Sequence, residues 1–186
     1  IVCHIDQKHP KMKTSNAYNA LFIFLVLFTF SCTSELGQNK LLKPWTGPYM
    51  GTPAFDKMQV ADVKPAMLKA MELNLEEIEA IASNPEAPNF ENTIEAMERS
   101  GKVLDRAFAY YGIFSSNMSS PEFRGVQTEL APLFSEFQSK ITQNKQLFKR
   151  IKAVYEASKT KPLEADQQRV VELTYQSFAM NGADLD

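Results

Sequence analysis

The segment VKPAMLKAMELNLEEIEAIA, residues 63–82, carries the pattern that decides the fold class. Its large apolar residues recur at intervals of three or four, which places them on one face of an α-helix. These residues are Met67, Met71, Leu75, Ile78 and Ala82. Asp62 is expected to cap this helix, and Pro65 is expected to lie in its first turn, where a proline is tolerated.

Four carboxylates occupy mainly the other side of the same helix, namely Glu72, Glu76, Glu77 and Glu79. Such a run could hold a metal ion or supply acid–base catalysis. However, no histidine accompanies it, and runs of charge on a helix usually face water. We therefore interpret the four carboxylates as a solvated face.

The same periodicity predicts four more helices, over about residues 90–115, 121–141, 145–158 and 164–180. Asn89 and Ser120 are the expected N-caps of the first two of these helices. Pro132 is expected to kink or break the helix at residues 121–141. Strand patterns are nearly absent, so the predicted fold class is all-α, with about five helices packed antiparallel.

The range 90–115 carries two further expectations. Gly101 lies on its apolar stripe, and we interpret it as a place where another helix approaches closely. Glu95 with Arg99 and Glu98 with Lys102 are spaced i,i+4 in the favourable order. Each of these two ion pairs is expected to contribute about 0.2–0.5 kcal/mol.

The composition excludes several classes of function. The chain has 186 residues, enough for one domain, and its 20 basic and 22 acidic residues give a net charge of −2. A nucleic-acid-binding protein usually has a basic excess, so this class is disfavoured. The basic residues Lys149, Arg150 and Lys152 are not interleaved with aromatic residues that suit base stacking, and we interpret them as a solvated face.

Histidine and cysteine are scarce. His4 and His9 are the only histidines, and Cys3 and Cys32 are the only cysteines. The two cysteines do not have metal-ligand spacing, and beyond residue 9 no nucleophile has a histidine to activate it. We therefore assign no catalytic residue and no metal-binding residue to this chain.

The first residues have the pattern of an export signal. Lys13 supplies positive charge after Met12, and the apolar run at residues 18–30 has the length of a signal peptide, shorter than a membrane span. We predict that residues 1–11 are upstream read-through sequence and that residues 12–31 form the signal peptide.

Cys32 follows a small residue at the end of the apolar run, as at the cleaved and lipidated cysteine of bacterial lipoproteins. We predict that Cys32 is lipidated and that the protein is exported, to be periplasmic or outer-membrane-anchored in a Gram-negative bacterium. The alternative is ordinary signal-peptidase cleavage near residues 29–31, with Cys32 as a free thiol. Residues 32–57 are expected to form a tether and an extended arm, and residues 58–186 a helical body.

One longer stretch is more specific than these patterns, EIEAIASNPEAPNFENTIEAMERSGKVLDR at residues 77–106. It resembles the N-terminal helical region of the peptidyl-dipeptidases, or dipeptidyl carboxypeptidases, which belong to the thimet-oligopeptidase-like zinc metallopeptidases. Four other pieces agree with the family's order: PWTGPYMGTPAFDKMQVADVKPAM at 44–67, SSPEF at 119–123, NKQLFKRIKAVY at 144–155 and LTYQSFAMNGADLD at 173–186. The resemblance therefore covers about residues 44–186.

The resemblance implies a helical enzyme with two lobes around a deep channel that excludes folded proteins. In this family zinc is bound by H-E-x-x-H and a Glu on a following helix, and the Glu of the motif is the general base. Peptidyl-dipeptidases release dipeptides from the C-termini of peptides, whereas other members cut short peptides internally. Because this sequence contains no H-E-x-x-H, we predict an N-terminal lobe that is inactive alone.

The expected partners are short peptides and, through the lipid anchor, a membrane. We expect the protein to be a monomer, and we expect its zinc to be bound by a C-terminal part outside this sequence. The alternative is a non-catalytic helical lipoprotein that binds peptides or a partner protein. A coiled-coil scaffold is disfavoured by the irregular spacing of the apolar stripes and by Pro132.

Overall fold

The computed structural model describes residues 39–46, 51–53, 55–161 and 163–183, all within the second of two units, Leu36–Asp186. The signal peptide and Cys32 lie outside the described residues, so the predictions about them stay predictions. Among the helices that the structure describes, none has the length and apolar character needed to cross a membrane.

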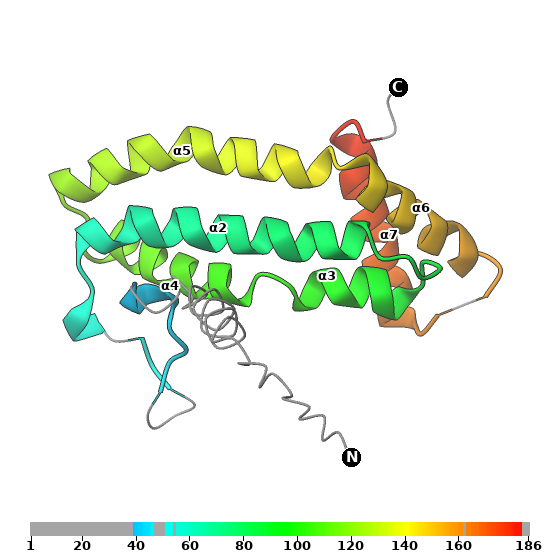
Figure 1. Cartoon of the computed structure of the whole chain (residues 1–186), viewed down its shortest axis with the longest axis horizontal. Helices are drawn as coiled ribbons and strands as arrows, with labels where there is room; N and C mark the ends of the chain where they lie inside the picture. The colour runs from blue at the N-terminus through cyan, green and yellow to red at the C-terminus, as the bar shows by residue number, and fades with distance from the viewer. Residues whose placement is uncertain (1–38, 47–50, 54, 162, 184–186) are drawn as a thin grey trace, which may run out of the picture. The chain divides into compact units, whose positions relative to one another are not determined.

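The described part of the chain contains helices and no strand, which confirms the all-α prediction. Figure 1 shows α2, α4 and α5 alongside one another, with successive members of this set running in opposite directions, and α6 and α7 packed together. The elements are η2 (Lys40–Leu42), η3 (Phe55–Lys57), α2 (Val60–Ala82), η4 (Phe90–Glu95, π-helical), α3 (Ala96–Arg99), α4 (Lys102–Ser116), α5 (Pro121–Thr142), α6 (Lys145–Ser158) and α7 (Ala165–Met180).

Helix α2 begins three residues earlier than predicted, and Gln59 is its N-cap in place of Asp62. Asp62 instead holds the preceding segment against the helix. Its backbone carbonyl accepts a hydrogen bond from the Asn39 side-chain amide (2.9 Å), and its carboxylate lies 3.0 Å from the Lys40 ammonium. The predicted cap is therefore wrong because Asp62 lies within the first turn of α2. The same earlier start places Pro65 inside the helix and not in its first turn.

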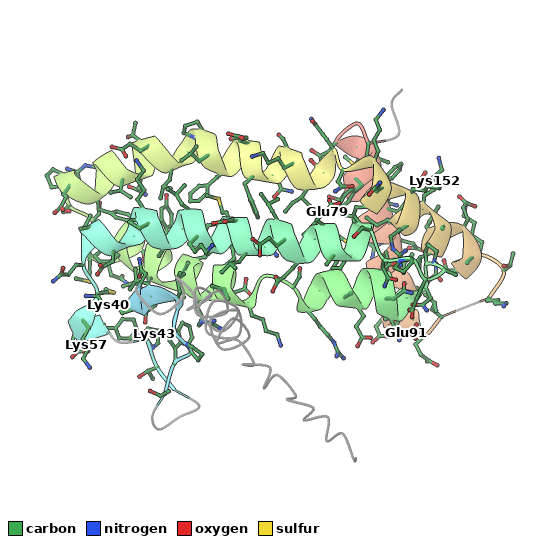
Figure 2. The ribbon with its side chains drawn as sticks, viewed as in Figure 1. Lys40, Lys43, Lys57, Glu79, Glu91 and Lys152 are labelled. Carbon is green, nitrogen blue, oxygen red and sulfur yellow. The ribbon has the colours of Figure 1, made fainter. Side chains whose placement is uncertain are left out.

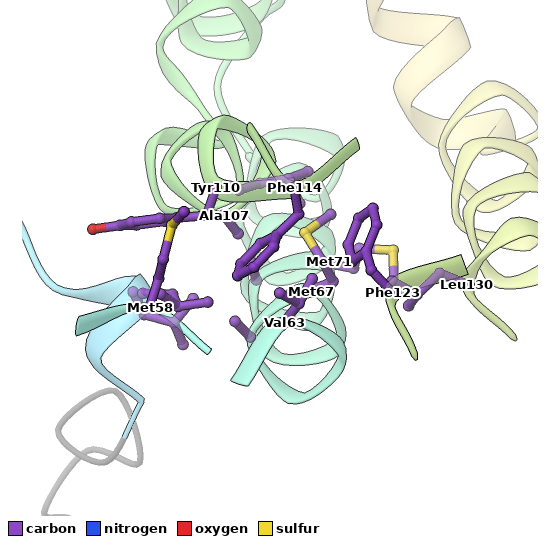
Figure 3. Packing of buried hydrophobic residues seen from close by; sticks show 14 residues of the cluster. Met58, Val63, Met67, Met71, Ala107, Tyr110, Phe114, Phe123 and Leu130 are labelled. Atoms are coloured by element: carbon purple, nitrogen blue, oxygen red, sulfur yellow. The ribbon is translucent and has the colours of Figure 1, made fainter. Parts of the chain in front are cut away.

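The first core cluster lies between α2, α4 and α5 (Figure 3). Met67 and Met71 of α2 pack beside Phe114 of α4 and Phe123 of α5, and each of the four side chains is at most 6% exposed. The two phenylalanine rings stack with their centroids 5.4 Å apart. Burial of a side chain of this size stabilises the fold by about 1.5–3 kcal/mol, so this cluster fixes the three long helices together.

The segment before α2 packs on the same cluster. Leu41 and Leu42 are each 1% exposed, and the guanidinium of Arg106 on α4 donates two hydrogen bonds to the Leu42 carbonyl, at 3.1 and 3.2 Å. The ring of Trp45 meets the ring of Tyr110 edge to face, with centroids 6.3 Å apart. These contacts tie the predicted arm to α4.

A second core cluster joins the end of α2 to η4, α6 and α7. Its buried members are Ile78, Ala82, Ile94, Leu147, Phe148, Ile151, Val154, Val171 and Phe178. The helices predicted at residues 145–158 and 164–180 are confirmed as α6 and α7. The N-caps are confirmed as well, because the Asn89 side-chain oxygen accepts from the Asn92 N–H (2.7 Å) and the Ser120 hydroxyl accepts from the Phe123 N–H (3.1 Å).

The predicted continuous helix at residues 90–115 is wrong. The chain leaves the helix at Ser100, which is extended, and Gly101 adopts the left-handed conformation with φ +77° before α4 begins. The Glu77 carboxylate accepts a hydrogen bond from the Gly101 N–H (2.6 Å), so Glu77 caps α4 from a neighbouring helix and is more than a solvated carboxylate. The amide nitrogen of Asn74, which is 6% exposed, lies 3.4 Å from the Ser100 hydroxyl.

The break at Ser100 and Gly101 affects only one of the two predicted ion pairs. Glu95 and Arg99 lie on the same side of the break and form the expected pair. Glu98 and Lys102 lie on opposite sides of it, so the helical spacing assumed for them does not hold.

Helix α5 continues through Pro132, so the break considered for this position is wrong. Proline removes the hydrogen bond that its N–H would donate to the carbonyl four residues earlier, which belongs to Thr128. Thr128 and Pro132 are both exposed, so water can satisfy that carbonyl. Figure 1 shows α5 as one gently arched helix.

Candidate functional site

The described residues do not provide a fit for zinc. Among residues 39–46, 51–53, 55–161 and 163–183, no group of three or more His, Cys, Asp or Glu side chains lies close enough together to hold a metal ion. Cys32 and both histidines lie outside these ranges. What the structure does place is a set of surfaces and polar networks.

A groove runs between α2 and α5. One hollow of about 570 Å³ adjoins a second of about 280 Å³, and the two share Glu72, Leu75 and Lys140. We call the combined surface the α2–α5 groove. It is lined by Leu68, Met71, Glu72, Leu75, Glu76, Ile78, Glu79, Leu133, Glu136, Phe137, Lys140 and Asn144.

The groove exists because α5 covers α2 unequally along its length. Before Pro132, Phe123 and Leu130 of α5 are fully buried. Beyond it, Leu133 and Phe137 are only half-buried although they are large and apolar. The second half of α5 therefore leaves part of its apolar face, and the facing side of α2, open to solvent.

The rim of the groove is mostly acidic. Its lining contains four carboxylates and one ammonium, a formal charge of −3 (four Glu against one Lys), whereas the whole chain carries −2. Lys140 lies 2.7 Å from the Glu136 carboxylate, and this hydrogen bond and charge lower the pKa of Glu136. Lys140 is thereby paired with a carboxylate of its own helix, and the α2 side of the groove stays acidic.

The acidic residues of α2 in the groove are Glu72, Glu76 and Glu79. Glu72 lies 3.0 Å from the Lys69 ammonium, and the Glu79 carboxylate accepts a long hydrogen bond (3.4 Å) from the Asn144 side chain at the start of α6. Figure 2 labels Glu79 near the end of α2. The interpretation of these three carboxylates as a charged, solvent-facing strip is confirmed, since all three are exposed.

Arg150 was expected on a solvated basic face, and the structure shows this to be wrong. The side chain is 6% exposed, and its guanidinium donates to the Asn84 carbonyl (2.7 Å), the Glu86 carbonyl (3.0 Å) and the Asn92 side-chain oxygen (2.9 Å). Arg150 thus fixes the connection between α2 and η4 onto α6. Its buried charge has a structural role, and the sequence contains no local signal for it because its partners lie 58 to 66 residues away.

A basic corner lies near the start of the described chain. Lys40, Lys43 and Lys57, which Figure 2 labels, come together in this region. They line a hollow of about 460 Å³, which Trp45 and Asp56 also border. Lys40 is already paired with a carboxylate of α2. Positions 47–50 and 54, which lie between the lining residues of this hollow in the sequence, fall outside the described ranges, so the α2–α5 groove is the better defined of the two surfaces.

Comparison with known proteins gives a consistent result. A family model described as "Neurolysin/Thimet oligopeptidase, N-terminal domain" matches residues 65–186. The dipeptidyl carboxypeptidase of Escherichia coli (strain K12) is 32% identical over 147 residues, covering 79% of this chain and 21% of that protein. The dipeptidyl carboxypeptidase of Salmonella typhimurium (strain LT2) is 29% identical over 150 residues, covering 81% of this chain and 22% of that protein.

Oligopeptidase A of Escherichia coli (strain K12) is 26% identical over 147 residues, covering 79% of this chain and 21% of that protein. The chain therefore spans about a fifth of the length of the curated relatives it matches.

Proposed function

The chain belongs to the neurolysin/thimet oligopeptidase family, within its N-terminal domain, and on this basis we propose that it is the N-terminal part of an exported zinc metallopeptidase. The proposed reaction is removal of dipeptides from the C-termini of short peptides. The observation that carries the proposal is the match to two dipeptidyl carboxypeptidases over about four fifths of this chain.

A dipeptidyl specificity is favoured over internal cleavage by the order of the identities. The two relatives named dipeptidyl carboxypeptidase are 32% and 29% identical to the chain, and oligopeptidase A is 26% identical. The acidic groove and the helical packing do not distinguish these specificities, because no described residue is placed at a reacting bond.

The proposal gives this chain a supporting role in catalysis. Since its described residues do not fit zinc, no step of hydrolysis is assigned to them. The helical lobe instead contributes a rigid wall, held by its two core clusters, against which a catalytic part can be positioned. We accordingly propose that the chain by itself does not hydrolyse peptides.

A peptide assay on the product of the complete reading frame tests the proposed reaction. We expect zinc-dependent release of the C-terminal dipeptide from a pentapeptide with a free C-terminus, and no release from the same peptide with an amidated C-terminus. Equal cleavage of both peptides at an internal bond would support an endo-oligopeptidase. The 186-residue chain is the matched control and is expected to leave both peptides intact.

Export and lipidation at Cys32 are part of the proposal and need their own measurement. We expect metabolic labelling with palmitate to mark the protein and the Cys32→Ser variant to lose the label. A mature protein that starts near residues 29–31 without a lipid would support ordinary signal-peptide cleavage instead.

A second candidate function is a non-catalytic helical lipoprotein that binds peptides or a partner protein. The open α2–α5 groove is the observation that favours it. This function predicts that the polypeptide from Cys32 to Asp186 unfolds in one cooperative transition. An aggregated or molten polypeptide would instead indicate that its apolar faces need a missing lobe.

A further inference from the structure

The α2–α5 groove has the length of a binding site for a helix. Its lining residues extend along α2 from Leu68 to Glu79. At 1.5 Å per residue this is an axial length of about 17 Å, which corresponds to about three helical turns. A helix laid beside α2 and α5 can therefore contact the groove over its whole length.

The floor of the groove is apolar and incompletely covered. Leu68 is 41% exposed, and Leu75, Leu133 and Phe137 are half-buried. Leu133 and Phe137 pack partly against the first core cluster, and the rest of each side chain faces the groove. An apolar strip of this kind between two helices is the usual receptor for the apolar face of an amphipathic helix.

The charge of the rim selects among amphipathic helices. The groove lining carries a formal charge of −3. Within it Glu136 is paired with Lys140, and Glu72 is paired with Lys69 beside the groove, so the acidic character rests mainly on Glu76 and Glu79. An acidic helix placed here would meet carboxylates of the same sign, whereas lysine or arginine side chains would meet opposite charge. An anionic bilayer surface is disfavoured for the same reason.

We propose that the α2–α5 groove binds an amphipathic helix whose apolar ridge is flanked by lysine or arginine side chains. The inference stands on the groove itself and does not depend on the proposed peptidase activity. Its test uses neither zinc nor peptide cleavage, so its failure is distinguishable from a failure of the proposed function.

Binding of a synthetic helix tests the proposal. The probe is an 18-residue helical peptide of leucine, alanine and lysine, with its leucines on one face. The full chain is carried in phosphatidylcholine nanodiscs, because residues 18–30 are apolar, and empty nanodiscs give the background. We expect saturable binding by fluorescence anisotropy that weakens as salt is raised, because exposed charges are screened by salt.

Two double variants distinguish electrostatic binding in the groove from non-specific binding of the peptide. Exposed ion pairs contribute little individually, so Glu72→Gln with Glu76→Gln is expected to weaken binding by about five- to tenfold. The matched control, Glu86→Gln with Glu98→Gln, removes two exposed carboxylates outside the groove and is expected to leave the affinity unchanged. Leu68→Ser is expected to weaken binding through the apolar floor, and circular dichroism checks that each variant is folded.

Three results would overturn the proposal. One is equally tight binding of a peptide in which glutamate replaces every lysine. Another is an equal loss of peptide affinity in the groove variant, Glu72→Gln with Glu76→Gln, and in the control variant, Glu86→Gln with Glu98→Gln. The third is self-association of the chain that disappears in Leu68→Ser, which would assign the groove to a second copy of this protein.

Discussion

Gly101 holds a backbone conformation that other residues rarely adopt. Its φ is +77°, and a Cβ added there would lie 3.2 Å from the Asn74 side-chain nitrogen. Gly101→Ala is therefore expected to destabilise the fold by about 1–2 kcal/mol, through strain in the left-handed region and through crowding of Asn74. Urea unfolding followed by circular dichroism measures this loss.

Gly112 provides the matched control, because it lies inside α4 and a Cβ there would have no neighbour within 4 Å. Gly112→Ala is expected to be neutral or to stabilise the fold by up to about 1 kcal/mol, since alanine favours the helix. An equal effect of the two substitutions would show that the break at Gly101 does not depend on glycine.

Arg150 makes three hydrogen bonds from a nearly buried position. Arg150→Met keeps most of the apolar stem but leaves two backbone carbonyls and the Asn92 oxygen without this donor. We expect a loss of at least about 2 kcal/mol in the free energy of unfolding. The exposed neighbour Lys149, changed to Met, is expected to alter stability by at most about 0.5 kcal/mol, and a similarly small effect for Arg150 would contradict its assigned role.

At the scale of the elements, substitution of Pro132 tests how this proline affects the stability of α5. Pro132→Ala restores an N–H in an exposed part of the helix, so we expect α5 to be stabilised by about 1–3 kcal/mol. Pro121→Ala at the first helical position is the matched control and is expected to have little effect. Thermal unfolding distinguishes them, and destabilisation by Pro132→Ala would mean that the proline shapes α5 in a way that the fold requires.

The helices were predictable from sequence because their signals are local. The bounds of α6 and α7, and the caps at Asn89 and Ser120, follow from residues within one or two turns of each position. The break at Gly101 was not predictable in this way, because the apolar stripe continues across it. The side chains that stabilise the break, Asn74 and Glu77, belong to α2.

The groove and the buried arginine show the same limit. Arg150 belongs to a basic cluster in the sequence that predicts an exposed face. Its hydrogen-bond acceptors, however, belong to the connection between α2 and η4, far away in the sequence. The α2–α5 groove depends on how α5 packs on α2 beyond Pro132, where Leu133 and Phe137 are only partly buried, and neither helix determines this packing alone. Its acidic strip was predicted from α2, but its apolar floor was not.

At the scale of the whole molecule, the described part of the chain is a helical unit with two core clusters and an open acidic groove. Membership of the neurolysin/thimet oligopeptidase family and the share of about a fifth of its relatives both fit an N-terminal lobe. The scarcity of histidine is then no argument against an enzyme, because the resemblance assigns the zinc ligands to a later part of the family's sequence.

The coding sequence downstream of Asp186 tests this account most directly. The account predicts an open reading frame that continues in the same frame and encodes H-E-x-x-H on a predicted helix, followed by a glutamate on a later helix. A stop codon directly after Asp186, with no such motif downstream in that frame, would contradict it.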